Sequence, residues 1–189
     1  MSHRSVHMLE LAMHILDIAE NSVRADATTV VITIIENEET DSLTIEIDDN
    51  GTGMDEDEIT KALDPFYTTK KVRRVGLGLP MLREACRRCD GMFAIESAKG
   101  TGTHIVARFR NSHIDRQPLG DMASSLVMLI TGNPDMDFIY THTKNGVSFM
   151  LNTATIKEAI EDVPINNPEI LRFIKNMINE GLKEIGVYD

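Results

Sequence analysis

At positions 48–54 the chain reads Asp-Asp-Asn-Gly-Thr-Gly-Met, a short acidic turn with two glycines. The turn closes an alternation of apolar residues over positions 43–47, which predicts a β-strand that ends there on a carboxylate, and Asp49 offers an acceptor of fixed position. Gly51 and Gly53 supply φ freedom and lack the Cβ that keeps main chain away from a ligand. The segment is typical of a binding turn. An ordinary hairpin or strand-to-helix loop, in which Asp and Gly are only turn residues, is the alternative.

Composition limits the class of protein. With 189 residues and 42% hydrophobic content, the chain is long and apolar enough to form a folded core. Its formal net charge of −11 argues against non-specific binding to nucleic acid or to an anionic membrane. We see no apolar run of membrane-spanning length and no signal-peptide pattern, so a cytoplasmic protein is expected.

The two cysteines, Cys86 and Cys89, are too few for a disulfide framework. They form a Cys-Arg-Arg-Cys sequence at the end of a predicted helix. Metal sites need about four ligands, and the dithiol motif of thioredoxin-like proteins begins a helix instead. We interpret both cysteines as incidental helix residues, with redox sensing as the alternative.

Helical spacing extends over residues 5–25, where polar side chains recur on one stripe. The stripe consists of Glu10, His14, Asp17, Asn21 and Arg24. Apolar residues on its flanks predict a helix that is buried on nearly all sides. A buried polar stripe needs partners, which a ligand would provide. A solvated helix face is the alternative.

The pattern that follows predicts a strand at 30–35, the strand at 43–47, a short helix at 55–63, a helix at 79–89, and strands at 92–97 and 103–109. The one concentrated basic segment, 71–74, leads directly into Gly76 and Gly78. Free N–H groups and the positive dipole end of the helix after Gly78 favour a phosphate group. The combination predicts a polyphosphate site.

Five motifs together resemble the ordered boxes of the GHKL (Bergerat-fold) superfamily. They are Asp-Ile-Ala-Glu-Asn-Ser at 17–22, the turn at 49–54, Asp-Pro-Phe-Tyr-Thr-Thr-Lys at 64–70, Gly-Leu-Gly-Leu at 76–79 and Gly-Thr-Gly-Thr at 100–103. This superfamily groups the ATP-binding domains of gyrase, heat-shock chaperone, histidine kinase and mismatch-repair proteins. The resemblance covers residues 5–110. The short loop between Lys70 and Gly76 is most similar to histidine kinases and anti-sigma-factor kinases.

The resemblance implies an α+β fold, a two-layer α/β sandwich of the Bergerat type, that binds ATP and Mg²⁺. It implies that Asn21 coordinates Mg²⁺ and that Asp49 accepts a hydrogen bond from the adenine amino group, with Thr103 supporting Asp49. An amide oxygen is a suitable ligand for a magnesium ion that keeps water and phosphate oxygens. The remaining nucleotide contacts that it implies are Gly51, Gly53, Met54, Thr69, Lys70, Gly76, Leu77, Gly78 and Leu79.

Two features depart from the family pattern. Where hydrolytic members carry Glu four residues before the Asn, this chain has Asp17, which we predict to be a catalytic general base on water or on a protein hydroxyl. No phosphoacceptor hairpin with a His box precedes position 5, so autophosphorylation on histidine within one chain is not expected in the usual arrangement. We interpret His14 as a packed or lid-contacting residue.

We expect residues 1–111 to form the ATP-binding domain and residues 112–189 to form a small α/β extension of unknown role. The extension comprises a linker at 112–119, helices at 120–131, 155–161 and 168–184, and a hairpin of strands 138–143 and 147–151. The predicted function is Mg-ATP binding in a kinase of the anti-sigma-factor or histidine-kinase type, acting in signal transduction on a separate protein partner. The alternatives are a slow ATPase with nucleotide-driven lid or dimer switching and a non-enzymatic ATP sensor. Neither nucleic acid nor membrane is an expected partner, and a homodimer is an open alternative.

Overall fold

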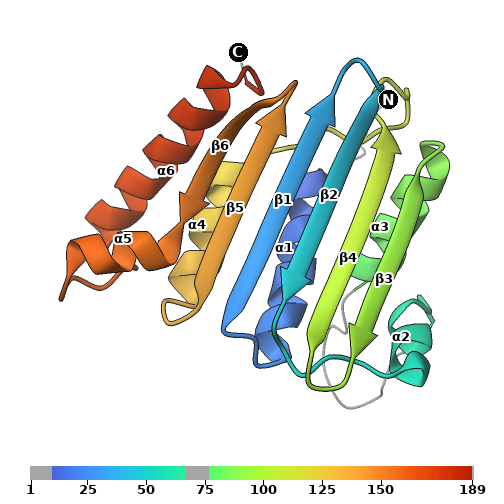
Figure 1. The fold of residues 1–189 in the computed structure, drawn as a ribbon, viewed down its shortest axis with the longest axis horizontal. Helices are drawn as coiled ribbons and strands as arrows, with labels where there is room; N and C mark the ends of the chain where they lie inside the picture. Colours follow the sequence, from blue (N-terminus) through green and yellow to red (C-terminus); the bar gives the residue numbers. More distant parts are fainter. Residues whose placement is uncertain (1–9, 67–76, 189) are drawn as a thin grey trace, which may run out of the picture.

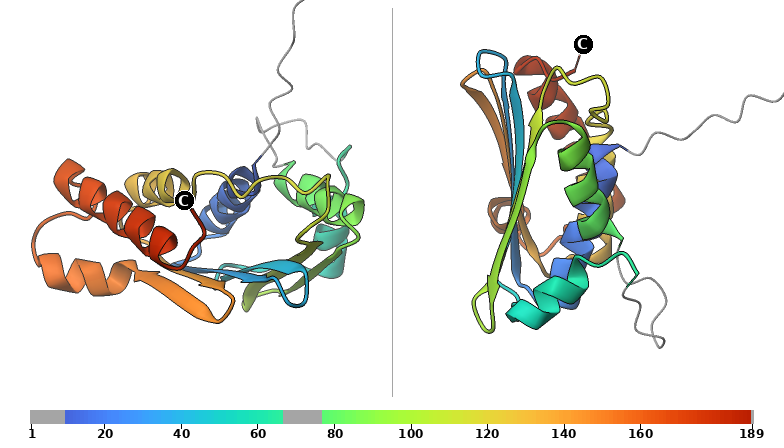
Figure 2. Two further views of the ribbon diagram at one scale, coloured as in Figure 1. Left: turned by 90° about the horizontal axis from the view of Figure 1, so that it is seen from above. Right: turned by 90° about the vertical axis from the view of Figure 1, so that its right-hand side faces the viewer.

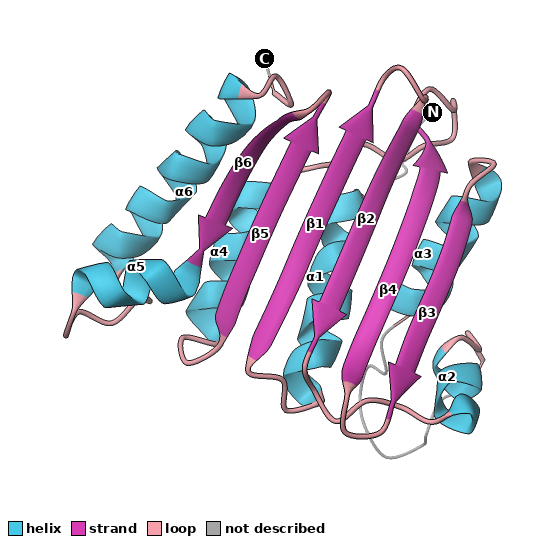
Figure 3. Cartoon of the chain, viewed as in Figure 1, coloured by secondary structure: helices cyan, strands magenta, loops and turns pink. Residues whose placement is uncertain are grey.

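The computed structural model describes residues 10–66 and 77–188 and contains a mixed six-stranded sheet (Figures 1 and 3). The strand order is β3-β4-β2-β1-β5-β6. Strands β1 and β5 are parallel, and the other neighbouring pairs are antiparallel. The strands are β1 (Thr29–Asn37), β2 (Ser42–Asp49), β3 (Met92–Ala98), β4 (Gly102–Arg110), β5 (Asp137–Lys144) and β6 (Val147–Asn152). The predicted α+β class is confirmed.

Helices cover one face of this sheet, so the molecule has two layers (Figure 2). The covering helices are α1 (Leu11–Arg24), α3 (Gly78–Arg88), α4 (Met122–Gly132) and α6 (Pro168–Glu184). Helices α2 (Glu56–Ala62) and α5 (Thr153–Ile160) lie near β3 and β5. The core forms between the layers because alternate strand residues, such as Val30, Ile32 and Ile34, all 0% exposed, face the helices.

Helix α1 departs from its expected burial. Leu11, Ile15 and Ile18 pack in the core, but Met13 and Asp17 are exposed. The expectation that this helix is buried on nearly all sides is therefore wrong. The reason is that the helices form a single layer, which leaves the outer side of α1 uncovered by the described elements (Figure 2). None of the described helices combines the length and the apolar character needed to cross a bilayer.

The C-terminal segment continues the same sheet. Strand β5 pairs with β1 over its whole length, and β6 follows as the edge strand. The linker before α4 also completes the first turn of α1. The carbonyls of Pro118 and Leu119 accept the N–H groups of Leu11 and Ala12, at 2.9 and 2.8 Å, while the N-cap residue Glu10 makes no side-chain cap. A domain division after residue 111 stays a prediction, and it would cut this sheet.

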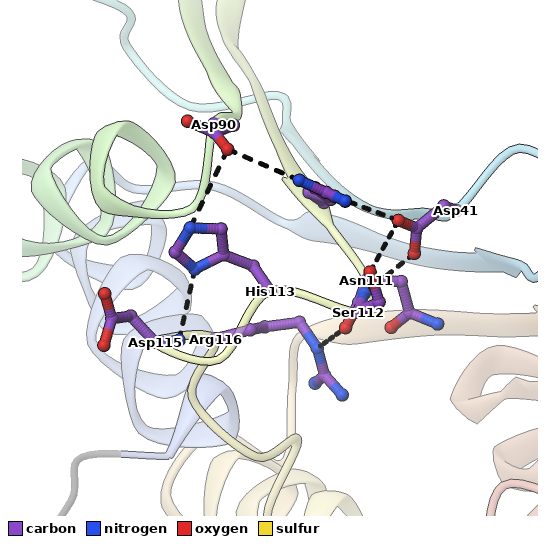
Figure 4. Close-up of polar contacts among 8 residues, drawn as sticks. Asp41, Asp90, Asn111, Ser112, His113, Asp115 and Arg116 are labelled. Carbon is purple, nitrogen blue, oxygen red and sulfur yellow. Dashed lines mark hydrogen bonds and ion pairs between the residues drawn. The ribbon is translucent and has the colours of Figure 1, made fainter.

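Polar contacts hold the linker against the sheet (Figure 4). The carboxylate of Asp41, in the β1–β2 turn, accepts from the Ser112 N–H at 2.8 Å and from its hydroxyl at 2.7 Å. The Arg116 Nε donates to the Asn111 carbonyl at 2.6 Å. His113 Nδ1 accepts the N–H of Asp115 at 3.1 Å. These bonds fix the direction in which the chain leaves β4 and crosses to α4.

Candidate functional site

A cavity of about 350 Å³ lies where α1, α2, α3 and the ends of β2 and β4 meet. Its volume is at the lower end of the range of about 300–1,000 Å³ that small-molecule sites occupy. It brings together several residues that the sequence predicted from separate motifs: Asn21, Asp49, Gly53, Met54, Leu79 and Thr103. The motifs that surround the predicted binding turn therefore converge in space.

Asp49 is a preorganised acceptor in this cavity. It is the last residue of β2, which runs two residues beyond the predicted strand at 43–47. Its Oδ2 accepts the hydroxyl of Ser22 at 2.7 Å, and its Oδ1 accepts the N–H of Gly51 at 2.9 Å. Ser22 is 2% exposed, so the first bond is protected from water. A carboxylate offers about four acceptor sites, so Asp49 is held in orientation and can still accept from a ligand.

Hydroxyl groups tie the turn to the β3–β4 hairpin. Asp49 and Thr103 are partners across the β2–β4 pair. The Thr103 hydroxyl forms a hydrogen bond with the Ser97 hydroxyl at 3.0 Å, and Ser97 Oγ accepts the N–H of Met54 at 2.8 Å. Direct support of Asp49 by Thr103 stays a prediction, because the threonine hydroxyl bonds Ser97 in this structure.

The two glycines of the turn are required by the packing of the protein itself. Gly53 has a φ of +65°, and a Cβ there would lie 1.9 Å from the Ala98 carbonyl oxygen. A Cβ on Gly51 would lie 2.7 Å from the Ala25 carbonyl oxygen. Any side chain at either position would displace backbone. The close approach of a ligand to these glycines stays a prediction.

Asn21 projects from α1 into the cavity wall beside Arg24. Its Oδ1, the oxygen predicted to bind Mg²⁺, accepts a hydrogen bond from Arg24 Nη1 at 3.0 Å. Arg24 also forms an ion pair with Glu20 at 3.3 Å. The sequence placed Arg24 on the polar stripe but did not select it as a site residue. Its position supplies a cation beside the predicted metal ligand.

Asp17 lies one helical turn before Asn21, on the exposed side of α1 and outside the residues that line the cavity. It packs against the first residue of α3, because a Cβ on Gly78 would lie 2.8 Å from the Asp17 Cβ. The N-cap of α3, Leu77, is exposed and its side chain makes no cap to the first N–H groups of this helix. Thr69, Lys70 and Gly76 fall outside the described residues.

The remaining sequence candidates are buried. His14 is 2% exposed, its Nε2 lies 2.9 Å from the Gln117 Oε1, and burial lowers the pKa of this imidazole below its usual value. The interpretation as a packed residue is confirmed. Cys86 and Cys89 are each 1% exposed, and burial raises the pKa of the Cys86 thiol to about 12. This agrees with incidental helix residues.

Besides Arg24, sequence reasoning did not select Ser22, Glu58 or Lys99 as residues of the site. Ser22 was named only as the last residue of the motif at 17–22, although its hydroxyl fixes Asp49. Glu58 of α2 and Lys99 of the β3–β4 turn line the cavity and form an ion pair. The capping pattern of Asp55 and Glu58 is legible in the sequence, but the partner of Glu58 is not.

Residues 8–113, more than half of the chain, match the family described as histidine kinase-, DNA gyrase B-, and HSP90-like ATPase. The chain belongs to this family. It contains an ATP-binding domain of the GHKL type, which confirms the resemblance drawn from the five motifs.

Curated relatives include two kinases of Bacillus subtilis (strain 168). Sporulation kinase E is 31% identical over 112 residues, covering 57% of this chain and 15% of the kinase. Sporulation kinase C is 31% identical over 94 residues, covering 50% of this chain and 22% of the kinase. Among solved structures, the Aquifex aeolicus MutL ATPase domain complexed with ADP matches with a TM-score of 0.45 and 16% identity, over 79% of this chain and 66% of that one. The chain therefore spans less than a quarter of the length of these two kinases.

Proposed function

We propose that the protein binds Mg-ATP in the cavity around Asp49 and transfers the γ-phosphate to a separate protein partner. The observation that carries the proposal is the convergence of Asn21, Asp49 and Leu79 on one cavity, with Asp49 fixed by Ser22. Adenine requires a fixed acceptor, which Asp49 provides. Magnesium requires an oxygen ligand such as the Asn21 amide, and phosphate is favoured by a helix N-terminus such as that of α3.

The adenine base would occupy the end of the cavity at Asp49. Adenine carries an exocyclic amino donor, and guanine carries a carbonyl oxygen at the same ring position, so a carboxylate there selects adenine. Apolar side chains complete the wall for a flat ring: Ile18, Met54, Ala62, Leu79 and Ile105. We assign Asp49 as the residue that selects the base.

The phosphates would lie toward α3. The uncapped N-terminus of α3 offers main-chain N–H groups and a positive dipole end. Asn21 would hold Mg²⁺, and Arg24, which bonds the same oxygen, would then be available to the phosphates. No group of three or more His, Cys, Asp or Glu side chains in the described part of the chain is arranged to hold a metal. This fits an ion that takes one protein ligand and completes its shell with phosphate and water oxygens. The bound ion would supply charge neutralisation.

Asp17 supports a second candidate activity, ATP hydrolysis. Its carboxylate is exposed, lies one turn from Asn21 and borders the start of α3. A general base in that place would take a proton either from the hydroxyl of a partner protein or from water. The same residue therefore serves both reactions, and the acceptor decides between them.

The relatives favour the kinase. Both Bacillus subtilis matches are named sporulation kinases, and this chain corresponds to less than a quarter of each. We propose that the acceptor is supplied by another protein, in the cytoplasm and without nucleic acid or membrane, which agrees with a net charge of −11. A homodimer is compatible with this proposal.

The test uses ATP labelled at the γ-phosphate, with proteins that co-purify with the chain. Transfer of label to a partner, lost in Asn21→Ala, is the expected result. Release of free phosphate that depends on Asp17 would replace the kinase with an ATPase. Tight ATP binding with neither transfer nor release would leave an ATP sensor. Unchanged ATP affinity in Asn21→Ala would overturn the site assignment.

A further inference from the structure

Helix α2 forms part of the cavity wall, although it buries little of its own surface. Glu58 and Ala62 line the cavity, yet none of the residues of α2 is buried. An element with little buried apolar surface opens locally at low free-energy cost. Polar contacts must therefore contribute much of what holds α2 in position.

The side chain of Glu58 forms the contact nearest to the cavity, an ion pair with Lys99. On the other side of α2, Arg83 Nη2 of α3 donates to the carbonyl of Leu63, directly after the helix, at 3.0 Å. Both members of the ion pair line the cavity, whereas Arg83 does not. The ion pair thus joins two elements of the cavity wall, α2 and the β3–β4 turn.

Glu58 is held in position by its own helix. Its Oε2 accepts the N–H of Asp55 at 2.9 Å, and its own N–H donates to Asp55 Oδ1 at 2.9 Å, forming a capping box. The hydrogen bond from Lys99 keeps the pKa of the Glu58 carboxyl below its usual value. Because the carboxylate is already oriented, pairing costs less side-chain entropy than pairing of two free side chains.

Lys99 also projects from an anchored segment. The N–H of the next residue, Gly100, donates to the carbonyl of Thr52 at 2.8 Å, which fastens the β3–β4 turn to the binding turn. Ser97 Oγ accepts the N–H of Met54 at 2.8 Å and adds a second tie. One partner of the ion pair is therefore fixed to the sheet, and the other to a helix with no buried residue.

We propose that the Glu58–Lys99 ion pair is a latch that holds α2 against the cavity and thereby sets how fast a bound adenine nucleotide leaves. The effect on nucleotide rests on the proposed function. The effect on α2 is a property of the fold alone. When the latch opens, the wall formed by Glu58 and Ala62 moves away and the base end of the cavity widens.

The first experiment measures hydrogen exchange of the α2 amides in nucleotide-free protein. An exposed ion pair changes an equilibrium by roughly 1.5- to 5-fold, so Lys99→Met should speed exchange within α2 by about that factor and leave the central strands unchanged. Glu58→Gln keeps an oxygen for the Asp55 N–H and should have the same effect. Arg87→Met is the matched control, because it removes an exposed ion pair with Glu84 that is remote from the cavity.

The second experiment measures dissociation of ribose-labelled fluorescent ADP by stopped flow. Both latch variants should release it roughly 1.5- to 5-fold faster than wild type, and the double variant no faster than either single one. If Lys99 instead held the nucleotide directly, Glu58→Gln would free the lysine and would not speed release.

The latch proposal would be refuted if the α2 amide hydrogens exchanged at the wild-type rate in both variants. An equal effect of Arg87→Met on α2 would also refute it. Faster exchange with unchanged release would refute its role toward the nucleotide. Failure of the wild-type protein to bind the labelled ADP would contradict the proposed function. The exchange experiment would still test whether the ion pair holds α2 in place.

Discussion

Asp49→Asn separates the structural role of this residue from its role toward a nucleotide. In the folded protein, the asparagine oxygen replaces Oδ1 and accepts the Gly51 N–H, and its amide nitrogen replaces Oδ2. The amide nitrogen then donates to the Ser22 hydroxyl, which turns toward the Ile18 carbonyl, 3.5 Å away. Because every polar group keeps a partner, the free energy of unfolding should change by less than about 1 kcal/mol.

Nucleotide binding should respond much more strongly. The substitution removes the charge and one of the two acceptor atoms, and the remaining oxygen already bonds Gly51. A hydrogen bond to a charged group contributes about 1.5–3 kcal/mol, which corresponds to about a 10- to 150-fold loss of ATP affinity. Calorimetric titration with ATP gives this affinity, and thermal unfolding reports the stability of the same samples.

Asp48→Asn is the matched control, since it removes one charge from the neighbouring residue. Successive strand residues point to opposite faces of a sheet, and Asp48 pairs with His104 instead of lining the cavity around Ser22. It should bind ATP like wild type. Wild-type affinity in Asp49→Asn, or an equal loss in Asp48→Asn, would refute the assignment of Asp49 to the base.

Three further outcomes are expected. Burial lowers the pKa of His14, so below about pH 6.5 the unfolded chain binds more protons than the folded one and the free energy of unfolding falls. The stability contributed by the neutral His14 imidazole is fully present above the pKa that His14 has in the unfolded chain. It is lost as the pH falls through the lower pKa that His14 has in the folded protein. Urea unfolding at about pH 7.5 and 5.5 should show a smaller decrease for His14→Gln, and an equal decrease would contradict it. Cys86, with its pKa raised to about 12 by burial, should not react with a thiol reagent in native protein at neutral pH, and rapid labelling would revive the redox interpretation. A chain of residues 1–111 lacks β5 and exposes the edge of β1, so it should aggregate or unfold. A soluble and cooperatively folded fragment in circular dichroism would instead support an independent N-terminal domain.

Local chemistry in the sequence predicted the elements well. Asn167 followed by Pro168 predicted the start of α6, and the Asn167 side chain accepts the N–H of Glu169 at 2.9 Å. The predicted hairpin of strands 138–143 and 147–151 likewise corresponds to β5 and β6. The neighbour of β5 was not predictable, because alternation tells which face of a strand is buried but does not identify the strand beside it. The parallel pairing with β1 joins segments separated by more than 90 residues.

In the site, too, local features could be predicted from the sequence, whereas contacts between distant residues could not. Asp49 could be identified because a strand ends there and glycines follow it. Ser22 could not, since its small side chain fits an apolar stripe equally well and its partner lies 27 residues further along the chain. The ion pair between Glu58 and Lys99 could not be predicted either, because it depends on where α2 packs beside the β3–β4 turn. Helical periodicity does not indicate where a helix packs. The sequence predicted the elements, but it did not predict these contacts between them.

Helix α1 connects the site to a part of the chain that the family match leaves out. The match ends at residue 113, yet the carbonyls of Pro118 and Leu119 complete the first turn of α1. Asn21 lies ten residues further on, which is about 15 Å along a helix that rises 1.5 Å per residue. A helix transmits a displacement of one end to the other because its backbone bonds are continuous, so the linker contacts help to set where Asn21 stands. The C-terminal segment is therefore part of the structure that positions the predicted magnesium ligand.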